Sequence, residues 1–189
     1  ASLGVIFSGD LQGKIMTEVQ PMKMAAAEGL YETTSNAPFS VLSIGSLDGS
    51  EATRIIEIPG LLSFLATGTW DGEVEGINEL RVSERAMAEK VAEQYGPEVA
   101  ALVLVDDYTP MIPLAYWSFR FMMGLGFATM AAAAATLWAM RKNRVPQGSV
   151  WTWVAILTPL APVFANSWGW IFTEAGRQPW IVYGLMTTS

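Results

Sequence analysis

The sequence predicts an all-α protein, an integral membrane helical bundle with a large extracytoplasmic loop. Residues 111–140 contain a single charge, Arg120, and residues 150–173 contain none. A helix needs about 20 apolar residues to cross a bilayer, so each stretch is long enough to span one. Between them lies a short basic loop, 141–148, with three Lys or Arg residues and no acid. By the positive-inside rule this loop faces the cytoplasm, which places residues 9–112 on the outer side.

Both ends of the sequence are apolar but too short to cross a bilayer, so we read them as pieces of helices and expect a fragment of a larger membrane protein. Six segments are therefore expected. They are the end of a transmembrane helix (1–8), an extracytoplasmic loop (9–112), a transmembrane helix (113–140), a cytoplasmic loop (141–149), a second transmembrane helix (150–175), and an outer loop with the start of a further helix (176–189).

The outer loop is expected to contain two helices. One begins at Pro21, and the other covers about residues 76–95, where apolar residues recur at helical spacing. Residues 35–50 and 60–76 are rich in small and turn residues, which predicts irregular connections.

Charge and composition exclude several classes of function. Residues 9–112 carry six Lys or Arg and seventeen Asp or Glu, a net charge of −11, whereas residues 113–189 have a net charge of +4. Nucleic-acid binding needs clustered basic residues, so no nucleic-acid partner is expected. Cysteine and histidine are absent from the sequence, so any metal must be held by Met, a carboxylate or residues of another chain.

Glu174 breaks a rule of helix chemistry. Gly176 and Pro179 predict the end of a helix whose last turn carries this acid. A carboxylate there meets the negative end of the helix dipole, which costs about 0.3–1 kcal/mol. Arg177 could pair with Glu174 as a structural cap, or the acid could belong to a functional site, and both interpretations remain open.

Three tryptophans are expected to cluster around Glu174, namely Trp168, Trp170 and Trp180. Trp170 lies one helical turn before the acid. An interfacial aromatic belt explains these residues, and so does an aromatic side chain packed between redox centres.

Counting residues places the candidate polar groups at one depth. A bilayer core of about 30 Å takes about 20 helical residues, which sets the outer boundary near Phe121 on the first span and near Trp170 on the second. Arg120, Met122 and Glu174 are therefore expected at the same outer edge.

Two residues of the first span are candidates for cofactor chemistry. Met122 shares a helix face with Gly126, and its thioether is a soft ligand for heme iron, although Met is also a common core filler. Arg120 could extend to the membrane interface or neutralise a heme propionate.

Lys23 and Glu28 are five positions apart on the first loop helix, so their side chains point about 140° apart. They could flank a ligand, one residue accepting a proton from a hydroxyl and the other contacting an oxygen. They could equally be two solvated surface charges.

Three stretches in this order resemble subunit I of the cytochrome bd-type quinol oxidases, in its C-terminal part. GDLQGKIMTEVQPMKMAAAEGLYET at 9–33 is similar to the start of that family's quinol-binding loop. YWSFRFMMGLGF at 116–127 resembles the helix that bears a methionine ligand of the low-spin heme, and GWIFTEAGRQPW at 169–180 resembles the glutamate-containing motif. The resemblance implies that the loop 9–112 binds quinol and belongs to the short-loop branch of the family.

The resemblance also implies a role for each candidate. Lys23 and Glu28 would bind quinol, and Met122 would be an axial ligand of low-spin heme b with Arg120 beside it. Glu174 would ligate a high-spin heme, either high-spin heme b or heme d. Arg177 would be the electrostatic partner of Glu174, and Trp170 an aromatic between hemes.

The implied reaction is quinol oxidation on the outer side and reduction of dioxygen to water, which generates a proton motive force without pumping. Implied partners are ubiquinol or menaquinol, dioxygen, the lipid bilayer, the N-terminal half of the same subunit and a second large membrane subunit, with or without small accessory subunits. The implied location is the bacterial cell membrane, which the subunit crosses several times. The alternative is a membrane-anchored binding or transport module with an acidic outside loop, in which Glu174 and Arg177 only cap a helix.

Overall fold

The computed structural model describes residues 2–45, 52–141 and 145–188. Eight helices and six short strands lie in these ranges. Their bounds are α1 (Ser2–Val19), α2 (Pro21–Glu28), β1 (Thr34–Ser35), β2 (Phe39–Gly45), β3 (Ala52–Ile58), α3 (Leu61–Thr67), β4 (Glu73–Val74), α4 (Ile77–Tyr95), α5 (Pro97–Val103), α6 (Ile112–Met140), α7 (Ser149–Leu157), α8 (Ala161–Ala175), β5 (Trp180–Val182) and β6 (Met186–Thr187).

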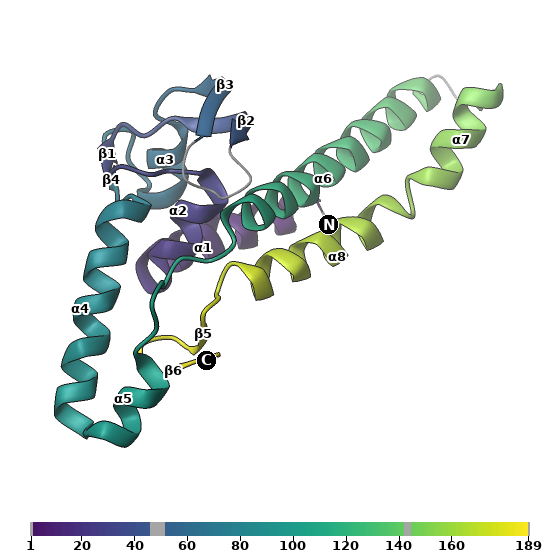
Figure 1. Ribbon diagram of the computed structural model, residues 1–189. Helices are drawn as coiled ribbons and strands as arrows, with labels where there is room; N and C mark the ends of the chain where they lie inside the picture. The colour runs from purple at the N-terminus through teal and green to yellow at the C-terminus, as the bar shows by residue number, and fades with distance from the viewer. Residues whose placement is uncertain (1, 46–51, 142–144, 189) are drawn as a thin grey trace.

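Helix α6 and the α7–α8 segment form a long antiparallel pair at one side of the molecule (Figure 1). Both are long and apolar enough to cross a membrane, with mean hydropathy of 1.5 over Ile112–Met140 and 1.3 over Ser149–Ala175. The buried residues of α6 all lie between Ile112 and Ser118, so most of the pair is uncovered within this chain.

The second apolar segment is not one continuous helix. It is interrupted at residues 158–160, between α7 and α8. Pro159 explains the break, because proline has no N–H to donate and its ring clashes with the carbonyl four residues earlier. The expected helix 150–175 is corrected in this respect.

The fold is mostly helical, as expected, but it is not all-α, because three antiparallel two-stranded pairs form, β1 with β4, β2 with β3, and β5 with β6. Residues 39–58 contain Val41, Ile44, Ile55 and Ile56, whose side chains favour extended backbone. The interpretation of 35–50 and 60–76 as irregular was therefore wrong for β2 and α3, and residues 46–51 lie outside the described part of the chain. The start of a further helix expected after residue 176 is instead the β5–β6 hairpin, which turns at Gly184 with φ of +74°.

Two other expected boundaries differ from the structure. Helix α1 continues through residues 8 and 9, where a span was expected to give way to a loop, since a single Gly costs a helix only about 1 kcal/mol. Residues 142–144 of the expected cytoplasmic loop lie outside the described residues. The helices expected at Pro21 and at 76–95 are confirmed as α2 and α4.

Helix α2 is the centre of the fold, because every residue from Met22 to Glu28 is buried. Its alanines pack against α4, α6 and α8, while Met24 and Leu30 pack against α3 and β4 in a second cluster. Gly29 ends the helix in the left-handed conformation, with φ of +59°.

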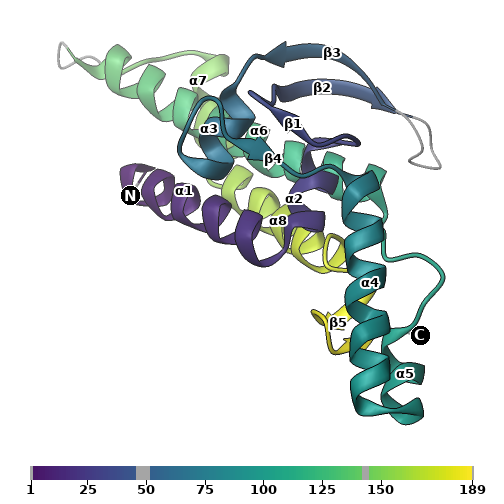
Figure 2. The same ribbon diagram turned by 90° about the vertical axis from the view of Figure 1, so that its left-hand side faces the viewer.

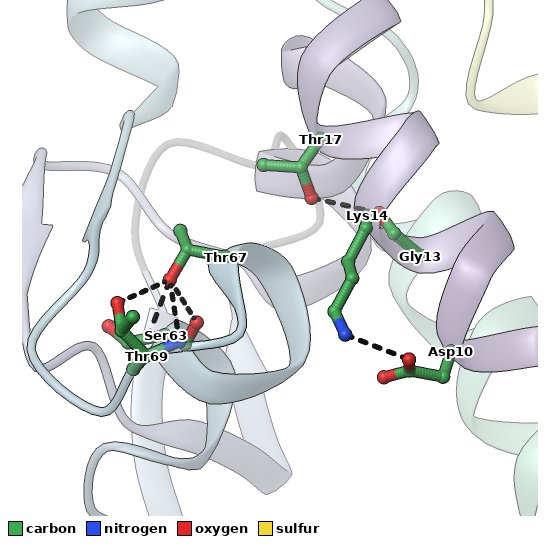
Figure 3. Close-up of polar contacts among 7 residues, drawn as sticks. All are labelled: Asp10, Gly13, Lys14, Thr17, Ser63, Thr67 and Thr69. Carbon is green, nitrogen blue, oxygen red and sulfur yellow. Dashed lines mark hydrogen bonds and ion pairs between the residues drawn. The ribbon is translucent and has the colours of Figure 1, made fainter.

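The outer elements form two groups around this centre. Helix α4 leads away from the helix pair to α5, and the β5–β6 hairpin lies beside them (Figures 1 and 2). Helix α1 packs against α3, where Lys14 pairs with Asp10 at 2.8 Å and Thr67 bonds to the carbonyl of Ser63 (Figure 3).

Candidate functional site

Lys23 and Glu28 are both buried, so they are not solvated surface charges. They occupy the two ends of α2 and reach different helices. Glu28 bonds to Arg120 of α6 and Lys23 bonds to Thr173 of α8, so α2 contacts both long helices.

Glu28 forms a bidentate ion pair with Arg120. Arg120 Nη2 donates to Glu28 Oε2 at 2.7 Å, and Nη1 donates to Oε1 at 3.3 Å. The side chains are 2% exposed for Glu28 and 8% exposed for Arg120. Each buried charge needs the other as its counterion, because an unpaired charge at this burial would carry a large desolvation cost.

Aromatic rings enclose the Arg120 guanidinium, which lies 4.4 Å from the ring centre of Tyr116, 4.8 Å from Phe39 and 5.4 Å from Phe119. The guanidinium of Arg120 is therefore held inside the fold. Its buried Nε has no hydrogen-bond partner within the described residues, which leaves one donor for a group outside them.

Lys23 lies against the C-terminal end of α8. Its Nζ donates to the carbonyl of Thr173 at 3.3 Å and stands 5.1 Å from the ring centre of Phe172. Carbonyls in the last turn of a helix lack helical partners and favour a nearby cation. Burial lowers the pKa of Lys23, the charge of Glu174 partly offsets this shift, and Arg177 adds to it.

Glu174 and Arg177 pair directly, with Arg177 Nη2 at 2.6 Å from Glu174 Oε2. The side chains are 42% and 39% exposed, so solvent screens the pair and its contribution to stability is small. Arg177 Nε is buried and has no partner among the described residues. The ion pair that one of the two open interpretations required thus forms, and among the described residues Arg177 Nε is still without an acceptor.

The three tryptophans separate in the structure. Trp168 packs against Phe121 in a tilted arrangement with ring centres 4.9 Å apart, and Trp180 is buried against Tyr108 beside α4. Trp170 is 68% exposed on α8. The three side chains thus have different neighbours, because helical spacing points Trp168 and Trp170 in different directions and Trp180 belongs to the β5–β6 hairpin, and the cluster around Glu174 stays a prediction.

Met122 faces α8 across the helix pair. A Cβ added at Gly169 would lie 2.8 Å from Met122 Sδ, so the sulfur occupies the space that this glycine leaves free. A Cβ at Gly126 would meet nothing within 4 Å, so that part of α6 is open within this chain.

Near Met122, the first half of α6 lies beside the C-terminal half of α8. Phe119 pairs with Phe172 at 5.0 Å, and Phe121 pairs with Trp168 at 4.9 Å. Residues near Arg120 and Met122 therefore lie opposite the last two turns of α8, which carry Glu174. The juxtaposition inferred by counting residues is present in the folded chain.

Glu84 is a buried acid that the sequence reasoning missed. It is 2% exposed and accepts hydrogen bonds from Trp180 Nε1 at 2.9 Å and from the Tyr183 hydroxyl at 3.1 Å. Burial raises the pKa of Glu84, and the two donors partly offset the shift. Its position in the sequence could have revealed it, because Glu84 falls on the buried stripe of α4. The stripe consists of Ile77, Leu80, Glu84 and Ala88, and only Glu84 is polar.

The chain supplies few ligands for a metal. Among the described residues no three His, Cys, Asp or Glu side chains gather around one point. Met122 offers one thioether and Glu174 one carboxylate, while the unpartnered Nε atoms of Arg120 and Arg177 suit anionic groups such as propionates. A thioether, a carboxylate and two guanidinium N–H groups are donor types that a heme site could use.

Comparison with known proteins gives a consistent result. The family model described as "Cytochrome bd terminal oxidase subunit I" matches residues 1–189. Over the whole chain, the sequence is 38% identical to "Cytochrome bd ubiquinol oxidase subunit 1" of Bacillus subtilis (strain 168) and 25% identical to "Cytochrome bd-II ubiquinol oxidase subunit 1" of Escherichia coli (strain K12).

A solved structure agrees with this match. The chain aligns over its full length to the bd oxidase from Geobacillus thermodenitrificans, with a TM-score of 0.68 and 30% identity. It covers 39% of that solved chain, and 37% and 45% of the two relatives. The sequence therefore spans less than half of the length of the proteins it matches.

Proposed function

Because this chain belongs to the cytochrome bd terminal oxidase subunit I family, we propose that it is part of a membrane quinol oxidase that reduces dioxygen to water. Quinol is oxidised on the outer side, beside α2. Electrons then pass through low-spin heme b, high-spin heme b and heme d, and the reaction generates a proton motive force without pumping.

The observation that carries this proposal is the position of α2. Its Glu28 is bonded to Arg120, two residues from Met122, and its Lys23 is bonded to Thr173, next to Glu174. An element that binds the electron donor must lie close to the groups that hold the electron acceptors, and α2 touches both helices that would do so.

Each candidate residue takes one role in this proposal. Lys23 and Glu28 bind quinol, Met122 ligates low-spin heme b with Arg120 beside a propionate, and Glu174 ligates a high-spin heme with Arg177 as its partner. Trp170 would be the aromatic side chain packed between the bound hemes. The hemes supply one-electron redox chemistry when bound, and their other ligands come from the N-terminal half of the subunit.

The exposed apolar faces of α6, α7 and α8 support the proposed setting. They are covered by lipid, by the N-terminal half of the subunit and by a second large membrane subunit, with small accessory subunits where these exist. Residues 9–112 lie on the extracytoplasmic side of the bacterial cell membrane, and residues 141–149 lie on the cytoplasmic side.

The first experiment is a reduced-minus-oxidised optical spectrum of membranes that contain the complete oxidase. Wild type is compared with Met122→Leu, and Met123→Leu on the same helix is the matched control. We expect separate b-type and d-type bands in wild type, selective loss of the low-spin b band in Met122→Leu, and no loss in Met123→Leu. A low-spin band retained in Met122→Leu would mean that Met122 only packs against its neighbours. Absence of heme in wild type would favour the anchored binding module.

A further inference from the structure

Glu84 lies where α4 meets the β5–β6 hairpin, and neither the proposed quinol contacts nor the heme ligands include it. Its carboxylate is almost completely buried and accepts two hydrogen bonds, from Trp180 and Tyr183. A carboxylate can accept about four hydrogen bonds. It therefore keeps lone pairs that can receive a proton.

A pocket of about 70 Å³ connects this acid to α2. One water needs roughly 10–15 Å³ of such space, so the pocket has room for several waters. Polar side chains of α2, of α4 and of the turns beside them line it, namely Gln20, Lys23, Glu84, Arg177, Gln178 and Tyr183. Lys23 and Glu84 thus line one space that is large enough to hold several waters.

We propose that Glu84 accepts a proton released by quinol beside Lys23 and returns it to the outer water through this pocket. The inference rests on the proposed function and extends it to a residue outside the quinol-contacting pair.

The step balances in atoms and electrons. When quinol is oxidised to quinone, two O–H bonds break, two electrons leave through the hemes of the complete oxidase, and two protons must be removed. One of these protons moves to Glu84, through a water of the pocket, and forms an Oε–H bond, while the other is released directly to water on the outer side. The neutral acid then loses the proton to water on the outer side and regains its negative charge.

The surroundings of Glu84 suit such a role. Burial raises the pKa of Glu84, so that the acid can hold a proton at a pH where exposed carboxylates cannot. The cations Lys23 and Arg177 face the same pocket, and Tyr183 contacts Glu84 directly, with its own pKa raised by burial.

The two arginines near Glu84 on the same helix have other partners. Arg81 donates a hydrogen bond to Thr109, and Arg85 donates one to Glu89. Residues that accept and release protons in turn work best when the pKa lies near the operating pH.

The test uses the complete oxidase in membranes and measures quinol-dependent oxygen uptake against pH. Glu84→Gln is compared with wild type, with Glu84→Asp, and with Glu89→Gln, which changes an exposed acid one turn and a half further along α4. Tyr183→Phe is the structural control, because it removes one hydrogen bond to Glu84 but keeps the carboxylate. Heme spectra of every variant establish assembly.

We expect Glu84→Gln to lower kcat by about 100-fold with little change in KM. In wild type the activity should rise with pH as Glu84 becomes deprotonated, and Glu84→Gln should lose this acid limb. Tyr183→Phe should lower thermal stability and keep the acid limb, moved to higher pH because a donor that lowers the pKa of Glu84 is lost. Glu89→Gln should match wild type.

Wild-type kcat and an intact acid limb in Glu84→Gln would overturn the inference and leave the proposed function standing. No quinol-dependent oxygen uptake by wild type would instead overturn the proposed function. If Glu84→Gln does not assemble with hemes, Glu84→Asp carries the test. A shifted acid limb in that variant supports the inference, and an unmoved limb contradicts it.

Discussion

Arg120 of α6 and Glu28 of α2 are 92 positions apart in sequence and form a bidentate ion pair inside the fold. The same guanidinium is enclosed by aromatic rings, so the pair has little access to water. It ties the buried helix α2 to the helix that carries Met122. The geometry of the proposed quinol site and that of the proposed low-spin heme site are therefore mechanically linked.

Removing one partner of this ion pair should lower the free energy of unfolding more than removing both partners. Glu28→Gln leaves the Arg120 charge buried without its counterion, so we expect a loss of about 3–5 kcal/mol in stability. The Glu28→Gln, Arg120→Met double variant should recover much of the loss. Thermal unfolding of the purified oxidase measures both, with Glu32→Gln, an exposed acid nearby, as control. Equal stability of Glu28→Gln and wild type would show that the pair is solvated in the complete protein.

Gly169→Ala should displace the sulfur of Met122. The added Cβ would lie 2.8 Å from Met122 Sδ, closer than van der Waals contact allows, and the flexible end of the methionine must move. We expect a shifted or weakened low-spin b band in the reduced-minus-oxidised spectrum, with the d-type band unchanged. Gly4→Ala in α1, where a Cβ meets nothing within 4 Å, is the control. An unaltered b band would mean that Met122 has another rotamer in the heme-loaded oxidase.

Lys23→Met should slow quinol oxidation while the hemes remain assembled. The substitution keeps an apolar stem of similar length but removes the cation that bonds to the carbonyl of Thr173. We expect a loss of about 10-fold or more in kcat/KM, equivalent to about 1.4 kcal/mol. Lys14→Met, which removes a half-exposed lysine paired with Asp10 on α1, should leave turnover unchanged (Figure 3). Turnover by Lys23→Met at the wild-type rate would contradict the quinol-site assignment.

Glu84 should make the stability of the fold depend on pH. Burial raises its folded-state pKa above the ordinary value of 4.5, so the folded state binds the proton more tightly than the unfolded state. Its stabilising contribution is complete below pH 4.5 and is lost as pH rises through the raised folded-state pKa. As pH rises through this window, the free energy of unfolding of wild type should therefore fall relative to that of Glu84→Gln. Thermal unfolding at a series of pH values measures it, and a constant difference would mean that the pKa of Glu84 is not raised.

Gly76→Ala should destabilise the start of α4. A Cβ at this position would lie 2.6 Å from the backbone nitrogen of Thr33, and backbone atoms cannot move aside as a side chain can. We expect a loss of about 1–3 kcal/mol in stability. Gly9→Ala in α1 has open space around its Cβ and should be neutral or stabilising by up to about 1 kcal/mol. Thermal unfolding compares the two, and equal stabilities would place the 32–33 turn elsewhere in the assembled oxidase.

The sequence alone determined those features that depend on near neighbours in the chain. The uncharged stretches predicted α6 and the α7–α8 segment because span length is a property of consecutive residues. Pro21 and Gly176 marked helix ends, and Glu174 with Arg177 formed the local pair that their spacing allowed. Three motifs in order were sufficient to indicate the family. The strands β2 and β3 were missed because the many small and turn residues around them predicted irregular structure, and the runs of β-branched residues are short.

Only the tertiary structure decided which distant side chains meet. Lys23 bonds to Thr173, 150 residues away, and Trp180 bonds to Glu84, 96 residues away. The sequence marked Lys23 and Glu28 as two charges on one short helix, but it did not show that the helix is buried or that Glu28 turns to Arg120. The physical reason is that such contacts depend on how whole elements pack, and a charge inside the fold is stable only where packing brings a partner within hydrogen-bond distance.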